Sequence, residues 1–521
     1  MKVSSSRIGQ DFGSSPNRSK LPNPSKLLTS TAASAVVAIF LFLTAILSAV
    51  GNEHRVDSAD ELESLIESNR VKPGDTIVWA DGEYKDVELN IEGADGTESS
   101  PIVLAAAHPG QVVFRGESQI RIGTRWWTIQ GFHFAGGPED VTNAYNTIQF
   151  RGNSGQAAEY VTLRDCALTN LRGEDDTSKW VLMYGRFNTI ERCTFLGKKK
   201  RGALLTVELG ELAADQSAEH LIQHNYFSDI AFQPGTDNET IRIGFSGDQN
   251  KSARCVVKKN LFVRCDGENE IISCKSSHNR FEANTFCQCN GALVLRHGHH
   301  AHVEGNYFFG DGATDSGGVR ISDSHHVIVN NYFQDLTGTT WNAALSILGG
   351  KEPTGGSGNG YQAVDGIIVA HNTFVNCRRS ILLSSEKGNR APRGIFANNL
   401  VVSSVDALVK VDLPPDNLHW TGNLMFGDLA RPHFASLTND PELELVEGRY
   451  RPSEFGPAAD RAVAIGMSVQ WDVEGKRRPT RGMDIGADEV SGASGTATSH
   501  PLTLKDVGVS FPLADVIPAA R

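Results

Sequence analysis

The sequence predicts an all-β fold: a right-handed parallel β-helix, or solenoid, with a short N-terminal capping helix. The first observation is a repeated element in which Asn is followed by a variable residue and then usually by Phe. Its clear copies begin at Asn225, Asn260, Asn284, Asn306, Asn331 and Asn372, and weaker copies begin at Asn399 and Asn423. The central copies are 24, 22 and 25 residues apart, and several follow short β-branched runs. A repeat of this length made of strands is typical of a solenoid of β-coils.

The repeated Asn and Phe residues are predicted to form ladders inside this solenoid. Successive coils of a parallel β-helix stack about 4.8 Å apart, so a residue that recurs once per coil lies over its equivalents. Asn amides and Phe rings both stack well in that arrangement. Leucine-rich repeats have a similar period, but they need several leucines at fixed places in each unit. We therefore assign the repeated Asn and Phe to the core.

The capping helix is predicted at residues 58–69. Ser58 and Glu61 match a capping box. Three further residues form an apolar stripe at helical spacing: Leu62, Leu65 and Ile66. Such a helix would cover the open end of the first coil. Turn and strand signals at residues 73–84 then lead into the coils, and the last coherent motif is at residues 484–489.

One elongated domain is predicted between two flanking segments. Residues 1–51 combine a polar, basic start with an uncharged, mostly apolar run, which is typical of a signal peptide cleaved after Gly51 or of an uncleaved N-terminal membrane anchor. Residues 52–490 form the predicted β-helix domain, and residues 491–521 a loosely structured C-terminal tail. We expect an exported protein, periplasmic or secreted, that contacts a membrane only through a retained N-terminal segment.

The composition limits the possible partners and bonds. A formal net charge of −12 argues against nucleic-acid binding, because phosphate recognition needs a basic surface. Eight cysteines in an exported chain would ordinarily suggest disulfides. Cys166 and Cys193 occupy ladder positions, however, so buried free thiols are the preferred interpretation. Histidines at 299–302 and 325–326 resemble a metal site in composition, but on solenoid turns we expect them to face solvent. The sequence does not predict the oligomeric state.

Five polar residues in the middle of the chain stand at intervals that the repeat converts into stacking distances. Glu268 and Glu270 are two apart, so on a strand both side chains point to one face, and Asn238 lies about one coil earlier. Carboxylate and amide oxygens are ligands suited to Ca²⁺. Lys275 follows closely, and Arg296 comes 21 residues after it, on the next coil. These intervals alone also fit a solvated ladder of salt bridges on the solenoid surface.

The residues around these five resemble polysaccharide lyase family six, which contains alginate lyases and the dermatan-sulfate lyase chondroitinase B. The resemblance spans most of the chain, and its specific motifs are Asn238-Glu239-Thr240-Ile241-Arg242, residues 268–276 and Arg296-His297-Gly298. It implies that Ca²⁺ is bound by Asn238, Glu268 and Glu270. It also implies that Lys275 is the Brønsted base and that Arg296 is the acid. The expected substrate-binding residues are Arg242, His297 and Arg320, with solvated surface charge as the alternative for the two arginines.

The same resemblance implies calcium-dependent cleavage of a 4-linked uronate polymer by β-elimination. Alginate is the expected anionic polysaccharide, and dermatan sulfate is the alternative. A C5-epimerase would begin with the same proton abstraction, and a non-catalytic carbohydrate-binding β-helix is the alternative outside the enzymes. A glycoside hydrolase of the pectinase type would need clustered aspartates, where this chain has Lys and Arg. Loops at 233–239 and 349–361 are expected to line the rim of the cleft and to select the polymer.

Overall fold

The computed structural model describes residues 51–137, 146–171, 178–352, 359–429, 434, 436–490 and 492–513. The predicted signal peptide or membrane anchor therefore lies outside the described residues, apart from Gly51. Within the described ranges, no helix is both long enough and apolar enough to cross a membrane.

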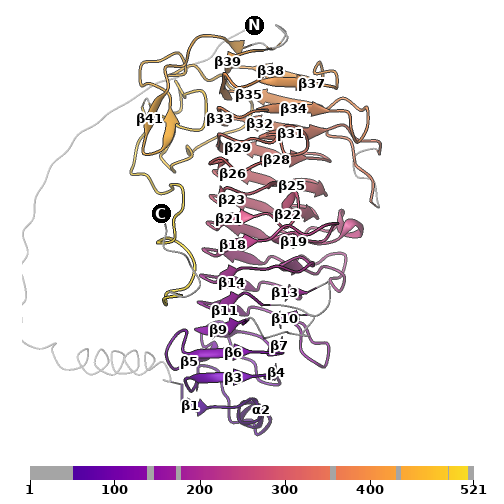
Figure 1. Cartoon of the computed structure of the whole chain (residues 1–521), viewed down its shortest axis with the longest axis vertical. Helices are drawn as coiled ribbons and strands as arrows, with labels where there is room; N and C mark the ends of the chain where they lie inside the picture. Colours follow the sequence, from indigo (N-terminus) through magenta and orange to yellow (C-terminus); the bar gives the residue numbers. More distant parts are fainter. Residues whose placement is uncertain are drawn as a thin grey trace, which may run out of the picture. The chain divides into compact units, whose positions relative to one another are not determined.

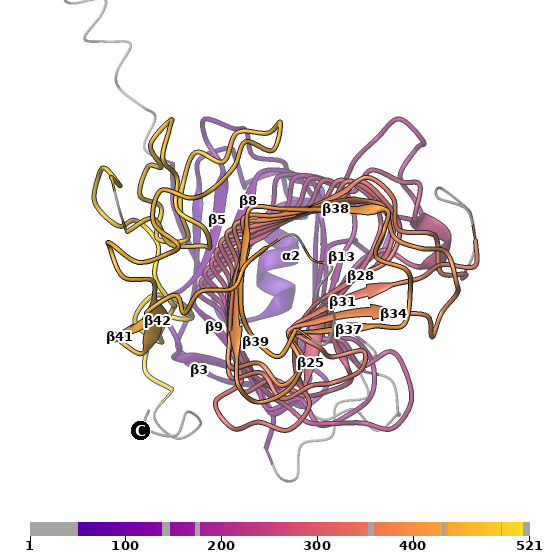
Figure 2. The same cartoon turned by 90° about the horizontal axis from the view of Figure 1, so that it is seen from above.

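The β-helix domain consists of three long sheets of parallel strands that wind as a right-handed solenoid, as predicted (Figure 1 and Figure 2). Most coils contribute one strand to each sheet in the chain order sheet 1, sheet 2, sheet 3.

Sheet 1 has 14 strands: β1 (Glu53–Val56), β2 (Thr76–Trp79), β5 (Ile102–Ala106), β8 (Trp127–Gln130), β11 (Thr162–Arg164), β14 (Thr189–Glu191), β17 (Leu221–Gln223), β20 (Val256–Lys258), β23 (Arg280–Glu282), β26 (His302–Glu304), β29 (Val327–Val329), β32 (Ile367–Ala370), β35 (Gly394–Ala397) and β38 (Leu418–Thr421). Sheet 2 also has 14 strands: β3 (Gly82–Lys85), β6 (Val112–Arg115), β9 (Phe132–Ala135), β12 (Ala167–Thr169), β15 (Thr194–Leu196), β18 (Tyr226–Ile230), β21 (Leu261–Cys265), β24 (Thr285–Cys287), β27 (Tyr307–Phe309), β30 (Tyr332–Gln334), β33 (Thr373–Val375), β36 (Leu400–Ser403), β39 (Asn423–Gly427) and β40 (Ser436–Leu437). Sheet 3 has 12 strands: β4 (Glu88–Glu92), β7 (Gln119–Gly123), β10 (Asn146–Gln149), β13 (Lys179–Met183), β16 (Leu205–Val207), β19 (Ile241–Ile243), β22 (Glu270–Lys275), β25 (Gly291–His297), β28 (Ser316–Ile321), β31 (Leu345–Leu348), β34 (Ile381–Ser384) and β37 (Val409–Val411). Outside these sheets are the helix α2 (Ala59–Glu67), the 3₁₀ turn η1 (Ser246–Asp248) and the antiparallel pair β41 (Glu444–Val446) and β42 (Arg449–Arg451).

The predicted Asn ladder runs along the corner between sheets 1 and 2, and the predicted Phe ladder runs along the strands of sheet 2. From Asn225 to Asn399, each side-chain amide donates to the Oδ1 of the Asn on the next coil at 2.9–3.1 Å, and the ladder ends at Asn423. From Phe195 to Phe374, successive rings stack 4.5–5.0 Å apart and within 8° of parallel. All these side chains are buried, so their assignment to the core is confirmed.

The capping helix α2 is one or two residues shorter at each end than the predicted range. The Ser58 Oγ accepts a hydrogen bond from the backbone N–H of Glu61 at 3.4 Å, whereas the Glu61 carboxylate accepts from Asp57 instead of from Ser58. The predicted apolar stripe is buried. The helix packs against β1 and β4, the first strands of sheets 1 and 3, and so covers the N-terminal end of the solenoid (Figure 2).

Sheet 3 is the sheet that carries the candidate site. Its strands β22, β25 and β28 have six, seven and six residues, whereas many strands elsewhere have three. The pairing of β22 with β25 shifts register between Cys274 and Lys275, so that Lys275 lies opposite His297. Such irregularities bend a strand and re-aim its side chains, and this one lies at the residue predicted to be the base.

The cysteines form no disulfide bonds. All eight cysteines are free, and seven are buried while Cys287 is half-buried, so buried thiols are confirmed as the preferred interpretation.

Residues 492–513 contain no helix or strand, yet they contact sheet 2 over several coils (Figure 1). The N–H of Leu502 donates to the Thr285 Oγ1 at 2.8 Å, and the N–H of Gly508 donates to the His224 carbonyl at 2.9 Å.

Candidate active site

A cleft of about 590 Å³ lies over β22, β25 and the loops around them. Its lining consists of Phe232, Gly235, Thr236, Asp237, Glu239, Ser246, Glu268, Asn269, Glu270, Lys275, Arg296, Trp341, Asn359 and Tyr361. Both predicted rim loops therefore contribute to the cleft, although residues 353–358 of the second lie outside the described residues. Four of the five residues singled out from the sequence line the cleft together, and the fifth, Asn238, is buried beside Glu268.

Lys275 is the last residue of β22, and its ammonium group meets a buried carboxylate. The Lys275 Nζ donates to the Glu239 Oε1 at 3.3 Å, and the Arg242 Nη1 lies 3.7 Å from the Glu239 Oε2. Burial raises the pKa of Glu239, although the charges of Lys275 and Arg242 oppose that shift. The Glu239 Oε2 is buried without a hydrogen-bond partner among the described residues. Glu239 therefore holds the lysine at the cleft with one oxygen and keeps the other unsatisfied.

The two predicted calcium-binding glutamates differ in environment. Burial, reinforced by the neighbouring charges of Glu239 and Glu270, raises the pKa of Glu268 to about 8. Burial would also raise the pKa of Glu270, but the Arg320 guanidinium and the Ser273 hydroxyl outweigh it and hold that pKa below its usual value. The Arg320 Nη2 donates to the Glu270 Oε1 at 2.6 Å. One carboxylate is thus paired with a cation, while the other is crowded by like charge.

Glu268 does not lie on a strand, so the expectation that Glu268 and Glu270 share one strand face is wrong for it. The strand β22 begins at Glu270, and Glu268 belongs to the bend before it. A hydrogen bond of 3.3 Å from the Asn238 N–H to the Glu268 Oε1 instead brings the bend towards the previous coil. The residues still meet, but the loop and not the pleat of the strand brings them together.

The donor set of this cluster fits a calcium ion. Carboxylate and amide oxygens are the hard ligands that Ca²⁺ prefers. The Asn238 Oδ1 accepts one hydrogen bond, from the Gly202 N–H at 3.3 Å, and a carbonyl oxygen has two lone pairs. The raised pKa of Glu268 and the unsatisfied Glu239 Oε2 both indicate a place where positive charge would be favourable.

Arg296, on β25, is fixed against the far wall of the cleft. Its Nη2 donates to the carbonyl oxygen and to the side-chain oxygen of Asn359, both at 3.2 Å. Its guanidinium lies 3.8 Å from the centre of the Tyr361 ring. Burial lowers the pKa of Arg296, yet an arginine remains charged in proteins. Lys275 and Arg296 thus present two cationic groups to one cleft from neighbouring strands.

The three predicted substrate-binding residues are buried and do not belong to the described lining of the cleft. Arg242 donates to Asp237 at 2.6 Å and stacks on Phe245, and Arg320 pairs with Glu270. The His297 Nδ1 lies 3.3 Å from the Gln362 Oε1, and burial, with Arg296, lowers its pKa to about 4. Direct contact with substrate stays a prediction for all three, and in this structure each lies against residues that line the cleft or support it.

Several cleft residues were not identified from the sequence. Glu239 was quoted only as part of a motif, and its contact with Lys275 has no signal in the spacing. Three aromatic side chains also line the cleft: Phe232, Trp341 and Tyr361. Lys387 lies 4.0 Å from the centre of the Trp341 ring. Aromatic residues on irregular loops outside the repeat are the signal that would have found these three.

Comparisons with known proteins identify the family of the chain. The profile of the family described as Chondroitinase B matches residues 56–445, which is well over half of the chain. Comparison with curated protein sequences found no match. Among solved structures, the chain is similar to the PL6 family alginate lyase AlyGC, with 29% identity and a TM-score of 0.71 over 77% of this chain and 55% of that one. This chain thus spans a little over half the length of AlyGC.

Two further structures extend the comparison. The chain is similar to a mannuronic acid specific polysaccharide family 6 lyase from human gut microbiota, with 28% identity and a TM-score of 0.63 over 72% of this chain and 86% of that one. It shares its fold with the PL6 family polysaccharide lyase Pedsa3628 from Pseudopedobacter saltans, with 23% identity and a TM-score of 0.59 over 88% of this chain and all of that one (100%). These matches define the class, the β-helical polysaccharide lyases. Within it, the chain belongs to the chondroitinase B family, polysaccharide lyase family six.

Proposed function

We propose that the protein is a calcium-dependent lyase that cleaves a 4-linked uronate polymer by β-elimination. The observation that carries the proposal is the meeting of Lys275, Arg296 and the carboxylate cluster in one cleft. Membership of the family does not by itself establish lyase activity, because this chain spans only 55% of the length of AlyGC.

The obstacle in such a reaction is the weak acidity of the sugar proton at C5, beside a carboxylate. Lys275, which lies at the cleft, takes this proton, and Glu239, which accepts a hydrogen bond from the Lys275 Nζ, positions the amine. The C4–O4 bond then breaks, and a double bond forms between C4 and C5. As O4 departs, it takes a proton from solvent, and Arg296 stabilises the negative charge that develops on it, because its guanidinium is fixed by Asn359 and Tyr361. An arginine keeps its own proton, so this role replaces that of the acid, which the family resemblance implies.

Calcium would be held by Asn238, Glu268 and Glu270. When bound there, it supplies positive charge that neutralises the uronate carboxylate and makes the neighbouring proton more acidic. Arg320, already paired with Glu270, holds that carboxylate in place. Other residues that line the cleft bind and orient the polymer, and the exposed ring of Phe232 offers a flat apolar surface to a sugar ring.

Alginate is the substrate that we propose. Two of the similar structures, at 28% and 29% identity, are an alginate lyase and a mannuronic acid specific lyase. Dermatan sulfate is the second candidate, because the family profile that matches is that of chondroitinase B. We also propose that the protein acts outside the cytoplasm, because its polar, basic start and the apolar run that follows are typical of a signal peptide or a membrane anchor.

The test is to incubate the purified protein, after removal of metal with a chelator, with mannuronate blocks, guluronate blocks and dermatan sulfate, with and without added calcium. A lyase produces an unsaturated sugar that absorbs ultraviolet light, and we expect this absorbance only with calcium and most strongly with an alginate block. An epimerase would change the ratio of the two uronates without new absorbance. Absence of both changes on all substrates would leave only a carbohydrate-binding function.

A further inference from the structure

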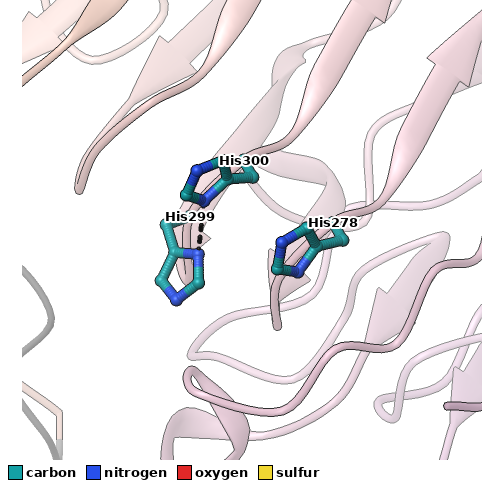
Figure 3. Close-up of side chains that lie close together, drawn as sticks. All are labelled: His278, His299 and His300. Carbon is teal, nitrogen blue, oxygen red and sulfur yellow. Dashed lines mark hydrogen bonds between the residues drawn. The ribbon is translucent and has the colours of Figure 1, made fainter.

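A second cluster of metal-binding side chains lies outside the cleft, on the turns that lead from sheet 3 to sheet 1. It consists of His278, after β22, and of His299 and His300, after β25 (Figure 3). A nitrogen atom of each ring lies within 4.8 Å of those of the other two. In the part of the chain that the structure describes, this is the one group of three or more His, Cys, Asp or Glu side chains that converges so closely.

Ring stacking accounts for two of these histidines. His278, His300 and His325 occupy equivalent turn positions on successive coils, with φ of 63°, 58° and 57°. Their rings stack 5.0 and 4.8 Å apart, within 10° of parallel. Nearer the N-terminus, the same corner carries Trp126 stacked on Tyr160. A column of flat rings is therefore a structural feature of this corner and does not by itself indicate a ligand.

His299 is not part of the column, and stacking does not explain its position. Its ring stands at 85° to that of His278 and at 82° to that of His300. Its Nδ1 lies 2.7 Å from the Nδ1 of His300 (Figure 3). The N–H of His299 donates to the Ser277 Oγ at 3.0 Å, which fixes the turn in this conformation. The His299 ring is thus nearly perpendicular to the rings of His278 and His300.

The other histidines near this corner have different roles. Both nitrogen atoms of the buried His326 are bonded, one to the Ala301 N–H at 3.0 Å and one to the Ser322 carbonyl at 2.9 Å. His302 pairs with Glu304 at 2.7 Å. Of the histidines in residues 299–302 and 325–326, only His299 and His300 belong to the converging group. Its third member, His278, lies outside both of these sequence clusters.

The chemistry of the three rings suits a metal ion. Burial and the neighbouring histidines lower the pKa of His278, His299 and His300, so near neutral pH the rings carry no charge, which is the form that binds metal. The His278 Nδ1 lies 2.9 Å from the Ser252 Oγ, and a partner on one ring nitrogen orients the other towards a metal.

We propose that His278, His299 and His300 form a binding site for a divalent transition-metal ion, of which Zn²⁺ is the representative. Imidazole nitrogens suit Zn²⁺, Cu²⁺ and Ni²⁺, whereas Ca²⁺ prefers oxygen. Three nitrogens and a water complete the tetrahedral shell of Zn²⁺ at bonds of about 2.0–2.1 Å. Two ligands of such an ion lie roughly 3.3 Å apart, so small ring rotations widen the 2.7 Å contact and close the longer separations.

A bound ion would join two turns that directly follow the catalytic strands. His278 lies three residues after Lys275, and His299 lies three residues after Arg296. Cross-linking these turns favours the folded state, so the melting temperature should rise with zinc concentration in excess calcium. The site is open to solvent because His300 is exposed.

The experiment measures zinc binding by calorimetry to the full chain, without an affinity tag, in excess calcium so that the carboxylate cluster is occupied. Cobalt in place of zinc adds a visible absorption spectrum that reports nitrogen ligands. His299→Gln removes a ligand at a position outside the column, and His278→Asn removes one from the other turn while retaining a residue that tolerates positive φ. The matched control is His325→Asn, which shortens the same stack and leaves the three ligands in place.

We expect the wild type and His325→Asn to bind one zinc ion with similar affinity, and both ligand variants to bind at least ~10-fold more weakly. All four proteins should have similar melting temperatures in chelator, which separates loss of a ligand from loss of the turn. The proposal is overturned if the wild type binds no zinc in excess calcium, or if His299→Gln and His278→Asn bind it as well as the control. Because the readout is metal binding, its outcome is independent of whether the protein degrades alginate.

Discussion

The asparagine ladder and the carboxylate cluster of the cleft are built by the same winding of the chain, yet their energetics are opposite. In the ladder, Asn284 donates to Asn306 and accepts from Asn260, so each amide satisfies its neighbours. In the cleft, ionised carboxylates can only accept, and burial, reinforced by the charges of Glu239 and Glu270, raises the pKa of Glu268 to about 8. Stacking on successive coils therefore stabilises Asn side chains, which can hydrogen-bond to one another. Ionised Glu side chains cannot, so their stacking favours a bound cation.

The largest expected effect is on the cleft side of this comparison. Lys275→Ala removes the proposed base, so kcat should fall about 10²–10⁴-fold, which is the usual contribution of general base catalysis. Calcium binding should change little, because Asn238, Glu268 and Glu270 remain. The melting temperature should fall, because the buried Glu239 loses the partner of its Oε1. Steady-state kinetics from the ultraviolet absorbance of the product, with calcium calorimetry, measures both.

Lys275→Arg is the matched control for that variant. It keeps a positive charge beside Glu239 but supplies a group that stays protonated, so it should be as inactive as Lys275→Ala. Substantial turnover by either variant would contradict the assignment of the base.

The second effect is on the ladder. Asn284→Ala leaves the Asn260 amide and the Val257 carbonyl without their buried partner, and each such loss costs about 1–3 kcal/mol. We expect a marked fall in the denaturant midpoint and in the melting temperature, with kcat of the folded protein nearly unchanged. Asn423→Ala, at the end of the ladder, should cost less. Among the described residues Asn423 donates to the Phe396 carbonyl but to no further Asn, whereas Asn284 also donates to the Asn306 Oδ1. Equal destabilisation by the two variants would argue against a continuous ladder.

The fold could be predicted because the ladder repeats. Six clear copies of one motif identify the solenoid, and the buried stripe of α2 follows from helical spacing. The polar cluster could be predicted because the coil length turns sequence intervals into distances, and the family resemblance supplied the roles. Both inferences depend on residues that recur at the period of the coil.

The rest could not be predicted because it depends on loops. Glu268 lies in a bend, and the sequence does not show whether a bend or a strand carries a carboxylate. The contact of Glu239 with Lys275 joins two coils through an irregular segment, and Tyr361 reaches Arg296 from a loop 65 residues further along the chain. The turn that sets His299 against His278 is equally local. Side-chain direction at such positions has no periodic signal.

The third prediction concerns the contribution of Glu268 to the pH dependence of stability. Its folded pKa of about 8 lies above its value in the unfolded chain, so between these two values the folded state binds more protons, and stability falls as pH rises. Without calcium, the melting temperature of the wild type should therefore decrease from about pH 5 to about pH 8 more steeply than that of Glu268→Gln. Calorimetry in chelator measures the difference between the two slopes.

Calcium is the control for this pH dependence. A cation bound at the cluster stabilises the ionised carboxylate, so added calcium should flatten the slope of the wild type and leave that of Glu268→Gln nearly unchanged. Identical slopes for the two proteins in chelator would mean that the folded state does not raise the pKa of Glu268.

The smallest effect is expected at the rim of the cleft, where the Tyr361 ring contacts Arg296, the residue proposed to stabilise the leaving oxygen. Tyr361→Ala removes the face on which the Arg296 guanidinium rests at 3.8 Å, and cation–π contacts of about 0.5–2 kcal/mol correspond to a loss of roughly 2–30-fold in kcat/KM. Tyr361→Phe keeps the ring and should lose less than about twofold. Because Tyr361 acts through Arg296, the loss should fall mainly on kcat. If KM rises instead while kcat is retained, the ring binds the sugar directly and the arginine is held by Asn359 alone.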